Sequence, residues 1–299
     1  MLFNKNYNDY KPEKLPSTRR EQYFDILKHN ILLFLLLGLT FLLFLLPTLC
    51  SIFIRDYYYA SYANLYSEGQ ITNEQFASLT NSLLNTMNIV IPISFIFISF
   101  PLAGILKILR RLSWSEPLFP LLDFFTGIKE NILKILLFTL IICSSIYGLY
   151  SIKLLNNSSW FIKYVPFGLF ACILIPLFLH FIILINIYNQ SIGKTIKNSF
   201  VLFFKSPFIT LLFSAILLLS IYLVGQINFI VIKILIYILL IVILLPAYLL
   251  LWYLYSISVL DKYINVKLFP EAYKKGLYIK EKNEEKVNRE DISNSENNN

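Results

Sequence analysis

Long runs of apolar residues dominate the middle of the chain, and short polar segments separate them. Six of these runs approach or exceed the roughly 20 residues that a helix needs to cross a bilayer. Within lipid every backbone amide needs a partner in its own segment, so each run is expected to be helical. The predicted spans are residues 31–54, 87–106, 131–152, 160–188, 207–224 and 227–260.

Two of the polar connections carry a helical pattern of their own. Residues 117–130 and 191–205 each place apolar side chains on one helical face and polar ones on the other. Such segments are typical of the membrane interface, and Gly127 offers a bend before the third span. When the chain is aligned with itself at a shift of 75 residues, Phe125 matches Phe200, and three apolar residues at 136–138 match those at 211–213. Either an internal repeat or two ordinary interfacial helices explains these matches.

The connection at residues 56–86 is the longest between two predicted spans, and it contains helix signals. Thr72 and Gln75 have the spacing of a capping box. We therefore predict that the first helix continues past its span and that an amphipathic helix returns. Thr18 and Glu21 have the same spacing and predict a short helix before the first span. The long connection also carries five tyrosines, which fit either an interfacial aromatic belt or a surface that stacks on a sugar.

The last predicted span has 34 residues, about 50 Å at helical rise. It must tilt, bend near Pro246 or project beyond the membrane.

Basic residues are concentrated in every other polar region of the chain, and this distribution predicts the orientation in the membrane. The N-terminal segment, the second and fourth connections and the C-terminal tail hold 22 of the 26 basic residues. The positive-inside rule therefore predicts that both termini are cytoplasmic. The predicted organisation is a cytoplasmic segment at 1–30, a membrane domain at 31–260, and a cytoplasmic tail at 261–299 that ends in disorder.

The amino-acid composition also indicates a membrane protein. The chain is 57% hydrophobic and 15% charged, whereas soluble domains carry about 25% charged residues. The predicted fold is therefore all-α, a polytopic membrane protein with six transmembrane helices and cytoplasmic amphipathic helices. The net charge of +8 is explained by topology and suits anionic lipids, so nucleic acid is not an expected partner.

Residues 100–138 carry a run of motif positions that resembles the YesL-like family of small bacterial integral membrane proteins. In that family a proline-ended span leads to a short basic helix and then to an aromatic segment of the form DFF-x-G-F-K-x-N. Residues 191–213 resemble a second signature of the same family. The overall resemblance covers roughly residues 87–260. The matching positions are Pro101, Asp123, Phe124, Phe125, Gly127, Lys129, Asn131, Lys197, Asn198 and Pro207.

Ile128 stands where that family usually has an aromatic residue, and the chain departs from the family pattern at two further places. Phe100 stands where the family has glycine before the proline, and the first span with its long outer connection resembles an addition. The resemblance implies a plasma-membrane protein that assists another system, such as carbohydrate uptake. Its expected protein partner is a transporter permease.

Three polar residues are candidates for chemistry. Asp123 either binds a cation or proton, or stabilises the start of its helix, where negative charge is favourable. His180 lies inside the fourth span, where an ionisable side chain indicates function by default, and Asn186 follows six residues later. The two either line a pathway or hydrogen-bond neighbouring helices.

No sequence motif for catalysis, phosphate binding or metal ligation is present, so we expect neither enzyme activity nor a cofactor or metal. The preferred hypothesis is a non-enzymatic accessory or assembly partner. The alternative is a small transporter or channel with a pathway near His180 and the proline-broken helices.

Overall fold

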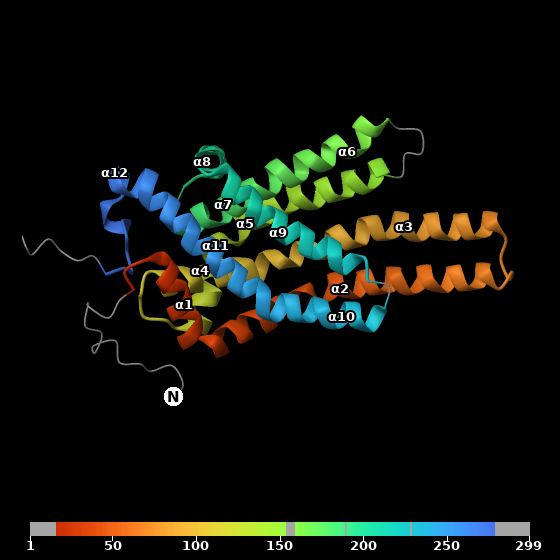
Figure 1. The fold of residues 1–299 in the computed structure, drawn as a ribbon, viewed down its shortest axis with the longest axis horizontal. Helices are drawn as coiled ribbons and strands as arrows, with labels where there is room; N and C mark the ends of the chain where they lie inside the picture. Colours follow the sequence, from red (N-terminus) through yellow and green to blue (C-terminus); the bar gives the residue numbers. More distant parts are fainter. Residues whose placement is uncertain (1–15, 154–158, 189, 228, 279–299) are drawn as a thin grey trace, which may run out of the picture.

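The computed structural model describes residues 16–153, 159–188, 190–227 and 229–278, and these residues form helices and connections without a strand. Figure 1 shows the helices arranged as an elongated bundle. The elements are α1 Arg19–His29, α2 Ile31–Ser67, α3 Asn73–Phe95, α4 Ser99–Ser113, α5 Pro120–Lys153, α6 Trp160–Leu169, α7 Ile175–Ile187, α8 Ile192–Lys205, α9 Pro207–Gly225, α10 Ile230–Leu239, α11 Leu245–Leu260 and α12 Val266–Leu268.

Six continuous helical stretches in the described residues are long and apolar enough to cross a membrane, so the all-α polytopic fold is confirmed. Four predicted spans fall within one of them, whereas the span predicted at 160–188 ends one residue beyond its stretch and the span predicted at 227–260 begins three residues before its stretch. Their bounds are Ile31–Ser67, Asn73–Ser113, Pro120–Ile152, Trp160–Ile187, Pro207–Gly225 and Ile230–Leu268.

The two ends of the bundle differ. At one end, which we call the termini end, the backbone N–H of Tyr278 donates to the carbonyl of Pro16 over 3.0 Å. At the opposite end, which we call the hairpin end, α2 and α3 extend farther along the bundle axis than the other helices (Figure 1). With six crossings both described chain ends lie on one side, in agreement with the predicted topology.

The connection at residues 56–86 is a helical hairpin, as its capping signals predict. α2 continues to Ser67, and α3 begins at Asn73. The hydroxyl of Thr72 accepts from the Gln75 backbone N–H, and the Gln75 side chain accepts from the Thr72 N–H, which completes the capping box. Thr18 likewise accepts from the Glu21 N–H at the start of α1.

The interfacial helix predicted at 117–130 does not exist as a separate element. Residues 120–153 form the single helix α5, so Gly127 is not a bend, and the first of the two similar segments runs straight into its span. The second is the separate helix α8, which is followed by a break at Ser206. Figure 1 shows α8 nearly end-on, so it crosses the bundle axis as an interfacial helix would.

Two spanning helices contain π turns just before prolines. Phe170–Leu174 precede Pro176, and Leu240–Leu244 precede Pro246, where the sequence predicts a bend. Proline has no N–H for the carbonyl four residues earlier and clashes with it. The wider turn accommodates this defect.

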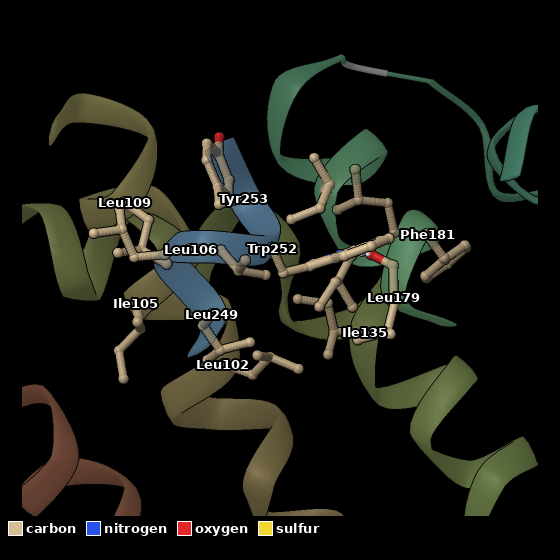
Figure 2. Close-up of a cluster of buried hydrophobic side chains, with 14 of the residues drawn as sticks. Leu102, Ile105, Leu106, Leu109, Ile135, Leu179, Phe181, Leu249, Trp252 and Tyr253 are labelled. Atoms are coloured by element: carbon tan, nitrogen blue, oxygen red, sulfur yellow. Dashed lines mark hydrogen bonds between the residues drawn. The ribbon is translucent and has the colours of Figure 1, made fainter. Parts of the chain in front are cut away.

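The densest part of the core lies between α4, α5, α7 and α11. Figure 2 shows Trp252 and Tyr253 of α11 among aliphatic side chains of those helices, and both aromatic residues are fully buried. The indole N–H of Trp252 donates to the Leu179 carbonyl over 2.8 Å. This hydrogen bond satisfies the one polar atom that the tryptophan brings into the core.

The tail predicted from residue 261 stays helical as far as Leu268. Turns occupy residues 273–276, after a short 3-10 helix at Pro270–Ala272. The predicted disorder falls on residues 279–299, and part of the predicted N-terminal segment falls on 1–15. Both lie outside the described residues.

Candidate functional site: the termini end and the hairpin end

The motif positions of residues 100–138 build a close contact between α4 and α5. A Cβ atom on Gly104 would lie 2.3 Å from the ring of Phe124, and one on Gly127 would lie 2.7 Å from the carbonyl oxygen of Ala103. Both glycines are therefore positions of close helix approach. Pro101 and Asn131 are buried in the same helices, whereas Phe125 and Lys129 are exposed.

Asp123 stabilises this helical hairpin. Its Oδ2 accepts from the Phe119 backbone N–H over 2.8 Å at the start of α5. Its Oδ1 lies 2.7 Å from Nε of Arg111 at the end of α4, and the carboxylate is only 1% exposed. The contact with Arg111 is an ion pair rather than an aligned hydrogen bond. The interpretation of Asp123 as a helix-stabilising charge is supported, with a cationic partner that sequence spacing does not reveal.

A second ion pair bridges the same two helices. The Lys107 ammonium, nearly buried, donates to both carboxylate oxygens of Glu130 over 2.9 and 2.7 Å. Because Glu130 is about half exposed, the pair lies at the rim of the bundle rather than in a sealed site.

The buried face of α8 agrees in part with the apolar face predicted for the second motif, because Phe203 is buried and Ile192 and Ile196 are half-buried against the core. The buried face of α8 includes the small polar residues Thr195 and Ser199, whose hydroxyls donate to carbonyls of their own helix turn. Phe200 and Phe204, placed on the predicted apolar face, are exposed. The buried face of α8 therefore includes small polar residues, and Phe200 and Phe204 lie outside it.

The remaining positions of the second motif have separate roles. Lys197 is exposed, and Asn198 donates to the side chain of Gln190 over 2.8 Å. Pro207 is the first residue of α9, as predicted. Ser206 makes no side-chain cap, because its hydroxyl donates back to Leu202.

His180 and Asn186 are both buried on α7, but they contact different neighbours. Nε2 of His180 lies 3.1 Å from the hydroxyl of Thr210 on α9, and its ring is 5.0 Å from that of Trp252. The amide of Asn186 donates to the carbonyl of Leu106 and to the hydroxyl of Tyr253. The structure therefore does not bring them together, and both bridge helices as the packing interpretation predicts.

Two polar atoms of this pair have no hydrogen-bond partner among the described residues. They are Nδ1 of His180 and Oδ1 of Asn186. A buried polar atom without a partner is costly, and it is the feature of these residues that packing alone does not explain.

The largest polar network lies at the termini end and joins α1 to the end of the last span. Arg19 and Asp261 form an ion pair of 3.0 Å, with side chains 10% and 8% exposed. Arg19 also donates to the carbonyls of Ser113 and Lys275. Burial lowers the pKa of Arg19 from its ordinary value, and the neighbouring Asp261 opposes that shift.

Further hydrogen bonds extend the network. Gln22, 1% exposed, donates to the carbonyls of Ser113 and Gly276. Asp261 also accepts from the side chain of Asn265 and from the backbone N–H of Lys274. The sequence prediction used Arg19 only as a topological charge. An isolated aspartate directly after a long apolar run was the available signal for a buried partner.

A cleft of about 400 Å³ lies beside this network. Its walls include the rings of Trp114, Tyr188 and Phe269 and the charged side chains of Glu271 and Lys275. The Lys275 ammonium lies 4.3 Å from the centre of the Trp114 ring and 2.8 Å from a carboxylate oxygen of Glu116. The one described cation in this wall is thus already engaged within the chain.

The hairpin end has its own charge cluster. Asp56 of α2 accepts from Arg55 over 2.8 Å and from Lys233 of α10 over 2.9 Å. Lys233 is 8% exposed although it lies in an apolar run. The pairing with Asp56 accounts for the burial of this lysine.

The tyrosines of the hairpin divide into two groups. Tyr59 and Tyr66 of α2 contact Phe76 of α3, with ring centres 6.4 and 5.2 Å apart. Tyr57 and Tyr58 are 64% and 45% exposed. The first group joins the two helices, whereas the described ring contacts of Tyr57 and Tyr58 are with tyrosines of α2 itself.

Comparison of the chain with protein-family models, with curated proteins and with solved structures found no match.

Proposed function

We propose that this chain is a non-enzymatic accessory protein of a bacterial plasma membrane, with both termini in the cytoplasm and the α2–α3 hairpin outside. Its partner is a polytopic transport protein, and the YesL-like resemblance makes a carbohydrate permease the first candidate. The orientation follows from the basic residues, which gather at the termini end. The observation that carries the proposal is the length of the hairpin.

The length argument is simple. α2 has 37 residues, about 55 Å at helical rise, whereas the hydrocarbon core is about 30 Å thick. If Ile31 marks one edge of that core, about 25 Å of α2 lies beyond the other edge. Tyr57 and Tyr58 then lie at headgroup depth, in agreement with an aromatic belt, while Tyr66 lies farther out.

The hairpin is suited to contact another protein because it is held rigidly. The ion cluster of Asp56 fixes its base against α10, aromatic contacts join its two helices, and a capping box starts the return helix. A rigid projection loses little conformational entropy on binding. It therefore presents a defined surface outside the membrane.

Site-specific cross-linking tests this proposal. A benzophenone amino acid at Tyr58 should form an adduct with a polytopic transport protein in intact membranes. The matched position is Phe24 on α1, which is similarly exposed but lies at the termini end, and it should give no such adduct. Removing residues 59–65 and 76–82 shortens both helices by about two turns each and should abolish the Tyr58 adduct.

The proposal fails if Tyr58 gives no adduct while the protein is folded and inserted, or if Phe24 gives the same product. A transport protein captured equally by the parent and by the shortened variant would also contradict a role for the hairpin.

Transport by the chain itself is the second candidate, and one observation favours it. His180 has an unpartnered ring nitrogen among the described residues, and π turns interrupt α6–α7 and α10–α11. Transporters use broken helices at their binding sites. Solute flux through purified protein in liposomes that is lost in His180→Leu would establish this candidate, whereas absence of flux in the parent would favour the accessory role.

A further inference from the structure

Two lysines at the termini end share one aromatic ring. The ammonium of Lys205, the last residue of α8, lies 5.6 Å from the ring centre of Tyr263. The ammonium of Lys262, in the π turn after α11, lies 5.3 Å from the same ring centre. Cation–π attraction at this distance favours each contact. The two like charges nevertheless repel each other.

Neither ammonium has a carboxylate partner within the described part of the chain. The adjacent acid, Asp261, is directed into the network with Arg19, Asn265 and the Lys274 backbone. Lys194 and Lys197 add exposed positive charge on α8. A group of cations without anions produces a positive local potential, which attracts an anionic ligand.

Exposed apolar side chains flank these cations along the chain. Phe204 precedes Lys205 and is 72% exposed, and Phe208 follows at the start of α9 and is 86% exposed. Leu268, the last residue of α12, is 70% exposed. α8 crosses the bundle axis (Figure 1), so its cations and its phenylalanines lie where headgroups meet acyl chains.

We propose that Lys205, Lys262 and Tyr263 bind the phosphodiester headgroup of an anionic phospholipid, with its acyl chains against Phe204 and Phe208. The two ammonium groups supply charge-assisted hydrogen bonds to phosphate oxygens. The tyrosine ring holds the ammonium groups in place before the lipid arrives. The site depends on both charge and an apolar flank, so its occupant is a lipid rather than a soluble phosphate.

Lipid binding to the purified full-length chain tests the site. Phosphatidylglycerol, phosphatidylcholine and inorganic phosphate are added separately in neutral detergent, and bound lipid is counted by native mass spectrometry. The parent should retain phosphatidylglycerol in preference to phosphatidylcholine. The double variant Lys205→Gln with Lys262→Gln should weaken phosphatidylglycerol binding on the order of tenfold, whereas Lys205→Arg with Lys262→Arg should retain it.

The matched control is Lys28→Gln with Lys129→Gln, which removes the same charge from exposed positions on α1 and α5. It should change binding less than twofold, and Tyr263→Phe should bind as the parent does because the ring is kept. Three results would overturn the proposal: equal retention of the two lipids, displacement of phosphatidylglycerol by equimolar phosphate, or equal losses in the control and the test variant.

Discussion

Replacing Gly38 by alanine should lower the free energy of unfolding by about 3 kcal/mol, the upper end of the usual range for overpacked cores. A Cβ atom at this position would lie 2.0 Å from the carbonyl oxygen of Val242. That carbonyl stands four residues before Pro246, in a π turn that α2 covers. A backbone group has no alternative rotamer, so α2 and the last span would have to separate.

Gly148→Ala is the matched control for this substitution. Gly148 also lies inside a spanning helix, but a Cβ atom there meets nothing within 4 Å. Alanine is the better helix former, so this variant should be at least as stable as the parent. Denaturant titration of both variants in detergent measures the difference. Equal stabilities would show that α2 does not pack on Val242 as described.

Replacing Asp261 by alanine should cost about 3–5 kcal/mol, because it leaves the Arg19 guanidinium buried without its counter-ion. The same change removes the acceptor for Asn265 and for the Lys274 backbone. Thermal unfolding in detergent should show the loss, together with increased hydrogen exchange in α1. The double variant Arg19→Met with Asp261→Leu should recover part of the stability, because it removes both charges.

Asp25→Asn is the control for Asp261→Ala. Asp25 pairs with His29 on α1, but both side chains are close to half exposed. Exposed ion pairs contribute less than about 1 kcal/mol, so this variant should unfold almost as the parent does. If Asp25→Asn and Asp261→Ala were equally mild, the termini-end network would contribute no net stability.

Features carried by local sequence could be predicted well. A run of apolar residues determines a spanning helix by itself, because lipid gives the backbone no other hydrogen-bond partner. The capping box at Thr72 and Gln75 involves residues three apart, so its spacing is visible in the chain. The α2–α3 hairpin and the start of α1 were predictable for the same reason.

Features that depend on distant residues could not be predicted. Gly127 resembles a bend in the sequence, but its role depends on Ala103 and Lys107 of the neighbouring helix. The partner of Asp123 is Arg111, and the partner of Lys233 is Asp56, neither of which has a helical spacing to it. The division of α8 into buried Thr195 and exposed Phe204 depends on how α8 packs against its neighbours, which its own periodicity does not show.

The candidate site was predicted only in part. His180 and Asn186 were recognised as unusual polar residues inside a span, and their burial agrees with that. Their division between two sets of neighbours depends on the rotation of α7 in the bundle, which periodicity alone does not fix. The lysines around Tyr263 were counted for topology, and their shared ring depends on the contact between α8 and the π turn after α11.

Cysteine accessibility tests the central claim, which is the threading of the six spans, most directly. Cys50, Cys143 and Cys172 are replaced by alanine, and single cysteines are placed at Gln70 in the hairpin turn or at Lys28 on α1. An impermeant maleimide added to intact cells should label Gln70→Cys at once and Lys28→Cys only after permeabilisation. Labelling of Lys28→Cys in intact cells, with Gln70→Cys protected, would reverse the orientation and contradict the account.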